Sequence, residues 1–171
     1  MRQKRTLSII ALALCVCMMG FAKAPKYVFY FIGDGMSLNQ VLGTQYFLSQ
    51  EKGKTGIMPL GFTAFPYTGL ATTFSASSDV TDSAAGGTAL ACGEKTANGS
   101  LGLSANQITK VKSIAEMAME QGKRVGIATS VTLNHATPAS FYAHQDNHDG
   151  SGYSRCDLYR AVECKEIGAD Y

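Results

Sequence analysis

The segment KYVFYFIGDGM, residues 26–36, limits the possible folds more than any other part of the chain. Residues 28–32 are an unbroken apolar run of β-branched and aromatic side chains, and the run stops at Gly33-Asp34-Gly35. Such a run predicts a strand buried on both faces, as in a parallel sheet. A second run, RVGIATS at 124–130, follows a helical pattern that Gly122 ends. Strands that alternate with helices predict an α/β fold with a mostly parallel sheet flanked by helices.

Helical spacing appears in two further places, around residues 38–49 and over 111–118. Ser104, ahead of the second stretch, is expected to cap one turn. Residues 51–79 are rich in Gly, Thr and Ser and predict loops and short strands. The last residues, 156–171, again show a helical pattern and a glycine, followed by three residues of a new strand. We therefore expect a domain that is incomplete at its C-terminus.

Residues 1–24 have the pattern of a secretory signal peptide. A basic start precedes an apolar run over 7–21 and the sequence Ala22-Lys23-Ala24. The run is shorter than the roughly 20 residues that a membrane span needs. We expect cleavage near residue 24, a secreted or periplasmic product beginning at 25, and no stable membrane association afterwards. A retained anchor, or lipidation at Cys15 or Cys17, is the alternative.

The net charge of +2 comes from this first segment. Of 15 lysines and arginines, four lie in residues 1–24, so that 11 remain beside 13 acidic residues. A nucleic-acid partner needs a clustered basic surface, and we expect none. The remaining cysteines, Cys92, Cys156 and Cys164, contain no C-x-x-C pair, which indicates neither a disulfide framework nor a structural zinc site.

The side chains with chemical potential follow predicted strands, where open α/β sheets place their ligands. Asp34 stands between two glycines, which leave its carboxylate unobstructed and let the backbone turn sharply. A carboxylate of this kind suits a divalent metal. A plain Asp-Gly turn is the alternative.

The segment VTDSAAGGTALACG, residues 80–93, places Ser83 before a crowd of small residues. If a helix begins near Ser83, its free N–H groups and its dipole favour an anion there. The small side chains would leave room for a phosphate to approach the hydroxyl. The alternative is that Asp82 or Ser83 only caps the helix.

The segment NHATPASFYAHQDNH, residues 134–148, contains every histidine of the chain. His135 and Thr137 would point to one side in an extended backbone. His144 and His148 would share one face of a helix. The concentration is typical of a metal site, and solvated loop histidines are the alternative.

Taken together, FIGDGM, VTDSAAGGTALACG and HATPASFYAHQDN resemble the alkaline phosphatase family in motif, order and spacing, from Tyr27 to about Asn147. The resemblance implies that residues 25–171 are the N-terminal part of an alkaline-phosphatase-like catalytic domain. It implies a secreted, metal-dependent hydrolase of phosphate monoesters with a phosphoserine intermediate and with zinc and magnesium as cofactors. Family members are commonly dimers, so a homodimer is expected when the protein is complete.

The resemblance also implies roles for individual residues. Ser83 would be the nucleophile, and Asp82 would orient the neighbouring groups. Asp34 would bridge a zinc and the magnesium, and Thr137 would be a magnesium ligand. His135 would tune the third metal site or bind zinc there.

Two departures from the family pattern bear on activity. His148 stands where the family has an arginine that clamps the phosphate, so its part in substrate binding would be weaker. The family's remaining metal ligands come from a C-terminal half beyond Tyr171. An inactive truncated fragment, or a remnant that binds metal or phosphate, is therefore one alternative. A phosphodiesterase or sulfatase relative is another, although DSAAGG lacks the proline and arginine of sulfatase nucleophile motifs.

Overall fold

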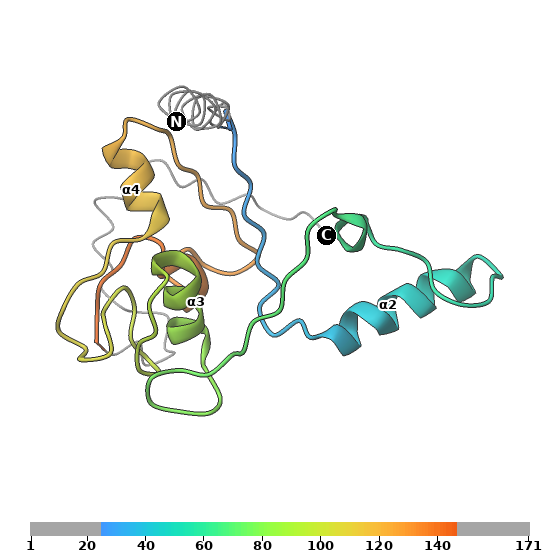
Figure 1. Ribbon diagram of the computed structural model, residues 1–171, viewed down its shortest axis with the longest axis horizontal. Coiled ribbons are helices and arrows are strands. Elements are labelled where there is room, and N and C mark those ends of the chain that lie inside the picture. The colour runs from blue at the N-terminus through green and yellow to red at the C-terminus, as the bar shows by residue number, and fades with distance from the viewer. Residues whose placement is uncertain (1–24, 147–171) are drawn as a thin grey trace, which may run out of the picture. The chain divides into compact units, whose positions relative to one another are not determined.

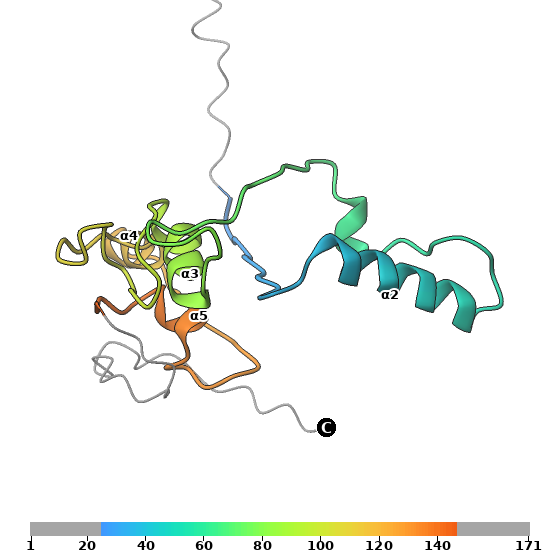
Figure 2. The ribbon, with the colours of Figure 1, turned by 90° about the horizontal axis from the view of Figure 1, so that it is seen from below.

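The computed structural model describes residues 25–146, and they fall into two units, one ending at Gly33 and one beginning at Asp34. The helices of the described residues all lie in the second unit (Figures 1 and 2). These are α2 (Leu38–Glu51), the 3-10 helix η1 (Gly61–Ala64), α3 (Ser83–Cys92), α4 (Ile114–Glu120) and α5 (Ala136–Ala139). The predicted signal peptide, the predicted helix after residue 156 and His148 lie outside the described residues.

Within residues 25–146 no strand is assigned, and pairing is limited to two isolated bridges, Leu101 with Gln145 and Leu103 with Lys110. Residues 28–32 and 124–130 therefore have no regular secondary structure. The rings of Phe29 and Phe31 stack at 6.5 Å, as side chains two apart on an extended backbone do. A strand exists only when a neighbouring strand accepts its hydrogen bonds. The mostly parallel sheet accordingly stays a prediction.

The helix predicted over 38–49 is confirmed and runs two residues further, to Glu51. Ser37 caps it by accepting the N–H of Asn39, while the Gln40 side chain accepts the N–H of Ser37 at 3.0 Å. Residue 51 belongs to α2, and residues 52–79 are loops as expected, with η1 in place of the expected short strands.

The expected cap at Ser104 is wrong, because α4 begins ten residues later. Ser113 is the N-cap, and Ser113 and Glu116 form a capping box with N···O distances of 3.0 and 3.1 Å. Ser104 instead belongs to a loop in which Gln107 has a φ of +59°, a left-handed conformation that no helix can continue. Gly122, with a φ of +73°, ends α4 as predicted.

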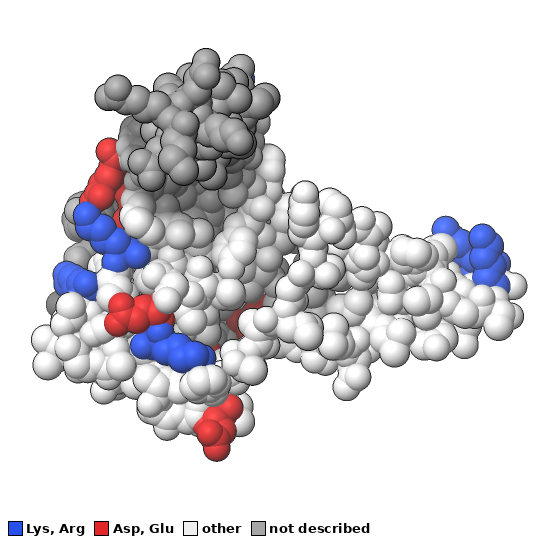
Figure 3. Space-filling model, viewed as in Figure 1, with Lys and Arg blue, Asp and Glu red and all other residues white. Residues whose placement is uncertain are grey.

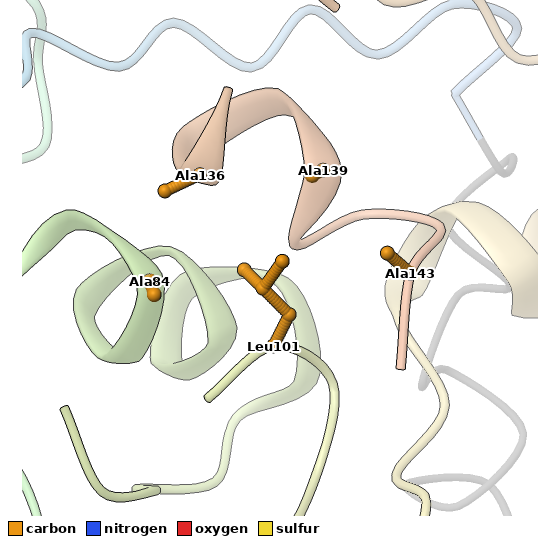
Figure 4. Packing of buried hydrophobic residues seen from close by; sticks show 5 residues of the cluster. All are labelled: Ala84, Leu101, Ala136, Ala139 and Ala143. Atoms are coloured by element: carbon orange, nitrogen blue, oxygen red, sulfur yellow. The ribbon is translucent and has the colours of Figure 1, made fainter. Parts of the chain in front are cut away.

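The core lies where α3 meets α5, and it is built mainly from alanines (Figure 4). Short side chains let the two helices approach closely, and a single large side chain, Leu101, fills the space between them. The buried apolar residues of this cluster are Ala84, Leu101, Ala136, Ala139 and Ala143.

Gly87 is the point of closest approach. A Cβ at Gly87 would lie 2.6 Å from Oγ and 3.0 Å from Cβ of Ser140, which follows α5. A Cβ at the neighbouring Gly86 would meet only the Thr81 side chain, at an ordinary 3.6 Å. The two adjacent glycines thus differ: Gly87 is required by packing, and Gly86 is not.

The face that Figure 3 shows is largely uncharged in the described part of the protein, with a few acidic and basic side chains on it. Large apolar side chains are exposed in several segments, including Phe31 at 87%, Tyr67 at 91% and Leu70 at 97%. None of the helices in residues 25–146 combines the length and apolar character needed to cross a bilayer.

The contrast between the two glycines can be tested by substitution in the full-length protein. We expect Gly87→Ala to lower the free energy of unfolding by about 1–3 kcal/mol, because the new methyl group separates α3 from α5. Gly86→Ala should be neutral or should stabilise the helix by up to about 1 kcal/mol. Urea unfolding of both variants measures the difference, and equal values would contradict the packing role of Gly87.

Candidate active site

Asp34 stands at the turn that the glycines predicted. Asp34 and Gly35 form the turn, and Gly35 has a φ of +70°, which favours glycine. The Asp34 side chain is exposed. The tight turn before α2 is therefore confirmed, and it presents a carboxylate.

Two hydroxyl groups from distant parts of the sequence converge on this carboxylate. The Thr137 hydroxyl donates to Asp34 Oδ2 at 2.7 Å, across 103 residues of sequence. The Ser83 hydroxyl also lies close enough to Asp34 to influence the pKa of its carboxyl group. The hydrogen bond from Thr137, and next the Ser83 hydroxyl, lowers the pKa of Asp34; burial opposes this shift, and the proximity of His135 adds to it. The three segments singled out in the sequence therefore meet at an ionised carboxylate.

Ser83 is the first residue of α3, and Asp82 is its N-cap. Asp82 Oδ1 accepts the N–H of Ala85 at 2.8 Å, and Oδ2 accepts the N–H of Gly99 at 2.7 Å. The capping alternative is thus confirmed for Asp82. Since both oxygens hold backbone groups, Asp82 fixes where α3 begins and hence where Ser83 lies.

Asn98 is a residue of this region that the sequence analysis missed. Its Oδ1 accepts the N–H of Asp82 at 3.3 Å, and its Nδ2 donates to the carbonyl of Val80 at 3.0 Å. The signal in the sequence is the pair Asn98-Gly99, which is typical of a tight turn.

The backbone at His135 and Thr137 differs from the expected extended conformation. His135 is the N-cap of α5, and Thr137 is the second residue of that helix. Pro138 follows in the first helical turn, where its missing N–H costs no helical hydrogen bond. The prediction from extended spacing is therefore wrong, although both residues act on Asp34, Thr137 by a hydrogen bond and His135 by its charge.

The donor atoms at this site suit one of the two expected metals better than the other. Asp34 and Thr137 offer oxygens, the donors that magnesium prefers. Catalytic zinc usually takes three protein ligands from His, Cys, Asp and Glu. Over residues 25–146, no three such residues come together.

Comparison with known proteins decides the family. The model of the family described as alkaline phosphatase matches residues 25–170. The chain belongs to the alkaline phosphatase family. The resemblance in the three motifs is thereby confirmed.

Relatives and solved structures agree with this assignment. Alkaline phosphatase 4 of Drosophila melanogaster is 35% identical over 137 residues, which are 75% of this chain and 23% of the relative. The structure of the cold-active alkaline phosphatase of Shewanella sp. matches with a TM-score of 0.63 and 36% identity, over 68% of this chain and 29% of that one. The structure of the alkaline phosphatase of the Antarctic bacterium TAB5 matches with a TM-score of 0.57 and 42% identity, over 66% of this chain and 30% of that one.

The described residues accordingly have an alkaline-phosphatase-like fold, and the chain spans about a quarter of the length of such relatives. A histidine-to-glutamate variant of the TAB5 enzyme has Mg bound in its M3 site. It matches with a TM-score of 0.50 and 41% identity, over 58% of this chain and 29% of that one.

His144 lies apart from His135 and does not form a histidine cluster with it. Its Nδ1 is 2.7 Å from the carbonyl oxygen of Gly102, and its Nε2 is 3.0 Å from Glu116 Oε1. A carbonyl only accepts, so Nδ1 carries a hydrogen. Because residues 141–146 are not helical, the helix face expected for His144 and His148 does not exist over that stretch. His144 has a structural role, joining α4 to the segment after α5.

Glu116 is the charged partner in this contact. Burial raises the pKa of Glu116, but the N–H of Ser113 and the ring of His144 outweigh it, so that the pKa is lowered overall. The carboxylate therefore stabilises the fold in its ionised form.

Cys92 ends α3 as a free thiol, with no disulfide in the described part of the protein. Burial raises the pKa of Cys92 to about 11, and the nearby charges of Glu116 and Glu94 contribute to the increase. The thiol stays protonated at neutral pH and is a poor nucleophile and metal ligand.

The lowered pKa of Glu116 predicts how acid affects stability. The ionised Glu116 carboxylate contributes fully to the free energy of unfolding above the ordinary pKa of 4.5. This contribution is lost as the pH falls through the lower pKa of the folded state. We expect Glu116→Gln to cost about 1–2 kcal/mol at neutral pH and to weaken the acid dependence of the free energy of unfolding. Glu120→Gln, which removes an exposed pair with Lys112, is the control. An unchanged acid dependence in Glu116→Gln would contradict the assignment.

Proposed function

We propose that the whole protein carrying this chain hydrolyses phosphate monoesters through a phosphoserine at Ser83. The observation that supports this most directly is the convergence of the Ser83 and Thr137 hydroxyls on Asp34. The three residues come from three separate motifs, and the alkaline phosphatase family to which the chain belongs carries these motifs.

The chemistry proposed for the protein's own residues has two steps. Ser83 Oγ attacks phosphorus, so that an O–P bond to the serine forms and the ester P–O bond breaks to release the alcohol, which takes up the proton that the serine hydroxyl loses. Water then attacks the phosphoserine and releases phosphate and free Ser83. Asp34 lies close to the serine hydroxyl, and Asp82 fixes the start of α3, so the oxygen is held before substrate arrives.

Magnesium and zinc are the proposed cofactors. Asp34 and Thr137 would hold magnesium through oxygen atoms that already lie 2.7 Å apart, with His135 beside them. The magnesium in the M3 site of the TAB5 variant supports magnesium as a cofactor. Asp34 would also be a zinc ligand, as one member of a set that residues 25–146 do not complete. When bound, zinc supplies Lewis-acid activation of a hydroxyl group.

The remaining expectations concern the whole protein. Secretion or periplasmic export rests on the signal pattern of residues 1–24, and a homodimer rests on the family alone. We expect residues 28–32 and 124–130 to be strands of the mostly parallel sheet, because the first run exposes apolar side chains that a neighbouring strand and helix would cover.

The role of Ser83 can be tested by trapping the intermediate. In the full-length protein, we expect Ser83→Ala to abolish phosphate incorporation when the protein is incubated with a phosphate monoester, quenched in acid and analysed by mass spectrometry. Ser104→Ala, in a loop whose hydroxyl contacts Asn106, is the matched control and should incorporate phosphate normally. Phosphate on a residue other than Ser83 would refute the nucleophile, and phosphate binding without turnover in the wild type would favour the inactive remnant.

This chain has a histidine at residue 148, where the family has an arginine, and this difference gives a second test. We propose that His148 contacts the phosphate and binds it more weakly than an arginine fork would. A bidentate charged contact contributes about 1.5–3 kcal/mol, so His148→Arg should lower the KM by about tenfold or more. His148→Lys supplies charge without the fork and should give a smaller change. An unchanged KM in both variants would remove His148 from the substrate site.

A further inference from the structure

The turn at Asn98-Gly99 makes four hydrogen bonds to the segment that leads into Ser83. Asn98 donates its backbone N–H to Ser77 Oγ at 2.9 Å and its Nδ2 hydrogen to the Val80 carbonyl at 3.0 Å. Its Oδ1 accepts the N–H of Asp82 at 3.3 Å, and the Gly99 N–H donates to Asp82 Oδ2 at 2.7 Å. One turn therefore holds the backbone on which the nucleophile's helix begins.

These bonds require Asn98 to be an amide. The side chain acts as a donor toward Val80 and as an acceptor toward Asp82 at the same time. An ionised carboxylate only accepts. At residue 98 it would face the Val80 carbonyl without a hydrogen between them, and it would place a second negative charge beside the Asp82 carboxylate.

An asparagine followed by glycine is chemically prone to spontaneous deamidation, which converts its side-chain amide to a carboxylate. The Gly99 nitrogen attacks Cγ of Asn98, a ring N–C bond forms, and the bond from Cγ to the amide nitrogen Nδ2 breaks to release ammonia, which carries away the hydrogen that Gly99 loses. Water then opens the succinimide ring to aspartate or isoaspartate. Glycine favours the reaction because no Cβ hinders the attacking nitrogen.

Both reacting groups are occupied in this structure. The Asp82 carboxylate accepts the Gly99 N–H, and a negative charge at 2.7 Å opposes loss of that hydrogen. The Asn98 amide is held between Val80 and Asp82 and is not free to turn its Cγ toward the Gly99 nitrogen. The contacts that place Ser83 are the same contacts that block the reaction.

We propose that Asn98 is a positioning residue for the Ser83 site and a latent deamidation site, which Asp82 protects and whose conversion to a carboxylate disables the site. The protection depends only on the fold. The loss of activity rests on the function proposed above for Ser83.

The protection is tested in the full-length protein held in mildly alkaline buffer, with peptide mapping by mass spectrometry to follow aspartate and isoaspartate at residue 98. We expect Asn98 to remain an amide in the native protein and to convert several-fold faster in urea. Asp82→Asn keeps an N-cap side chain but loses the charge that holds the Gly99 N–H, so it should convert several-fold faster than wild type without urea. Asn106, which glutamine follows, is the internal control.

Equal conversion in native and urea-treated protein, or in Asp82→Asn and wild type, would overturn the protection. If Asp82→Asn unfolds, Asp82→Ser, which keeps a favourable N-cap residue but removes the carboxylate that accepts the Gly99 N–H, replaces it, and an unchanged rate there would count against the proposal in the same way.

The positioning role is tested by Asn98→Asp beside Asn106→Asp, which adds the same charge in another loop. We expect Asn98→Asp to lower kcat by about tenfold or more with little change in KM, because the nucleophile is displaced while substrate-binding groups are untouched. An unchanged kcat, or a loss equal to that of Asn106→Asp, would overturn the positioning role. If the wild-type protein itself forms no phosphoserine, the proposed function fails. The deamidation rates would still test whether Asp82 protects Asn98.

Discussion

Gly87 has no Cβ, and the space that a Cβ would fill is occupied by Ser140 after α5. This close approach of α3 to α5 determines the geometry of the candidate active site. Ser83 begins α3 and Thr137 lies in α5, so the contact between the helices brings both hydroxyls to Asp34. The alanines of both helices act in the same way, because larger side chains would hold the helix axes apart. The run of small residues after Ser83 thus has a packing role in addition to any room it leaves for a phosphate.

A second layer of order comes from Asp82 and the turn at Asn98-Gly99. Asp82 uses one carboxylate oxygen for the helix and the other for the turn, and Asn98 returns a bond to the Asp82 backbone. The arrangement is reciprocal, so that the loss of any member leaves another polar group without its partner. A nucleophile at the first residue of a helix needs this support, since helix ends fray unless side chains satisfy their free backbone groups.

The histidines illustrate how far a cluster in sequence can differ from a cluster in space. His135 lies near Asp34, whereas His144 joins Glu116 to the backbone of Gly102. His144 lies nine positions after His135, and α5 ends between them. Gly102 makes the second contact possible, because a Cβ there would lie 2.3 Å from the Ala143 carbonyl and 2.5 Å from His144 Nδ1. Composition alone could not separate the two roles.

The features that depend on neighbouring residues could be predicted from the sequence: α2 and its start, the turn at Asp34, the helix that begins at Ser83, the end of α4 at Gly122, and the family, through its motifs. These follow from caps, glycines and periodicity within a few residues. Three contacts became visible only in the folded chain: Asp34 accepts a hydrogen bond from the hydroxyl of Thr137, Asn98 supports Asp82, and His144 has a structural role. The tertiary structure also gave residues 28–32 no regular secondary structure, although their composition predicts a strand. The physical reason is the same throughout: a local pattern sets a residue's preference, but its partner comes from a distant part of the sequence and is chosen by packing.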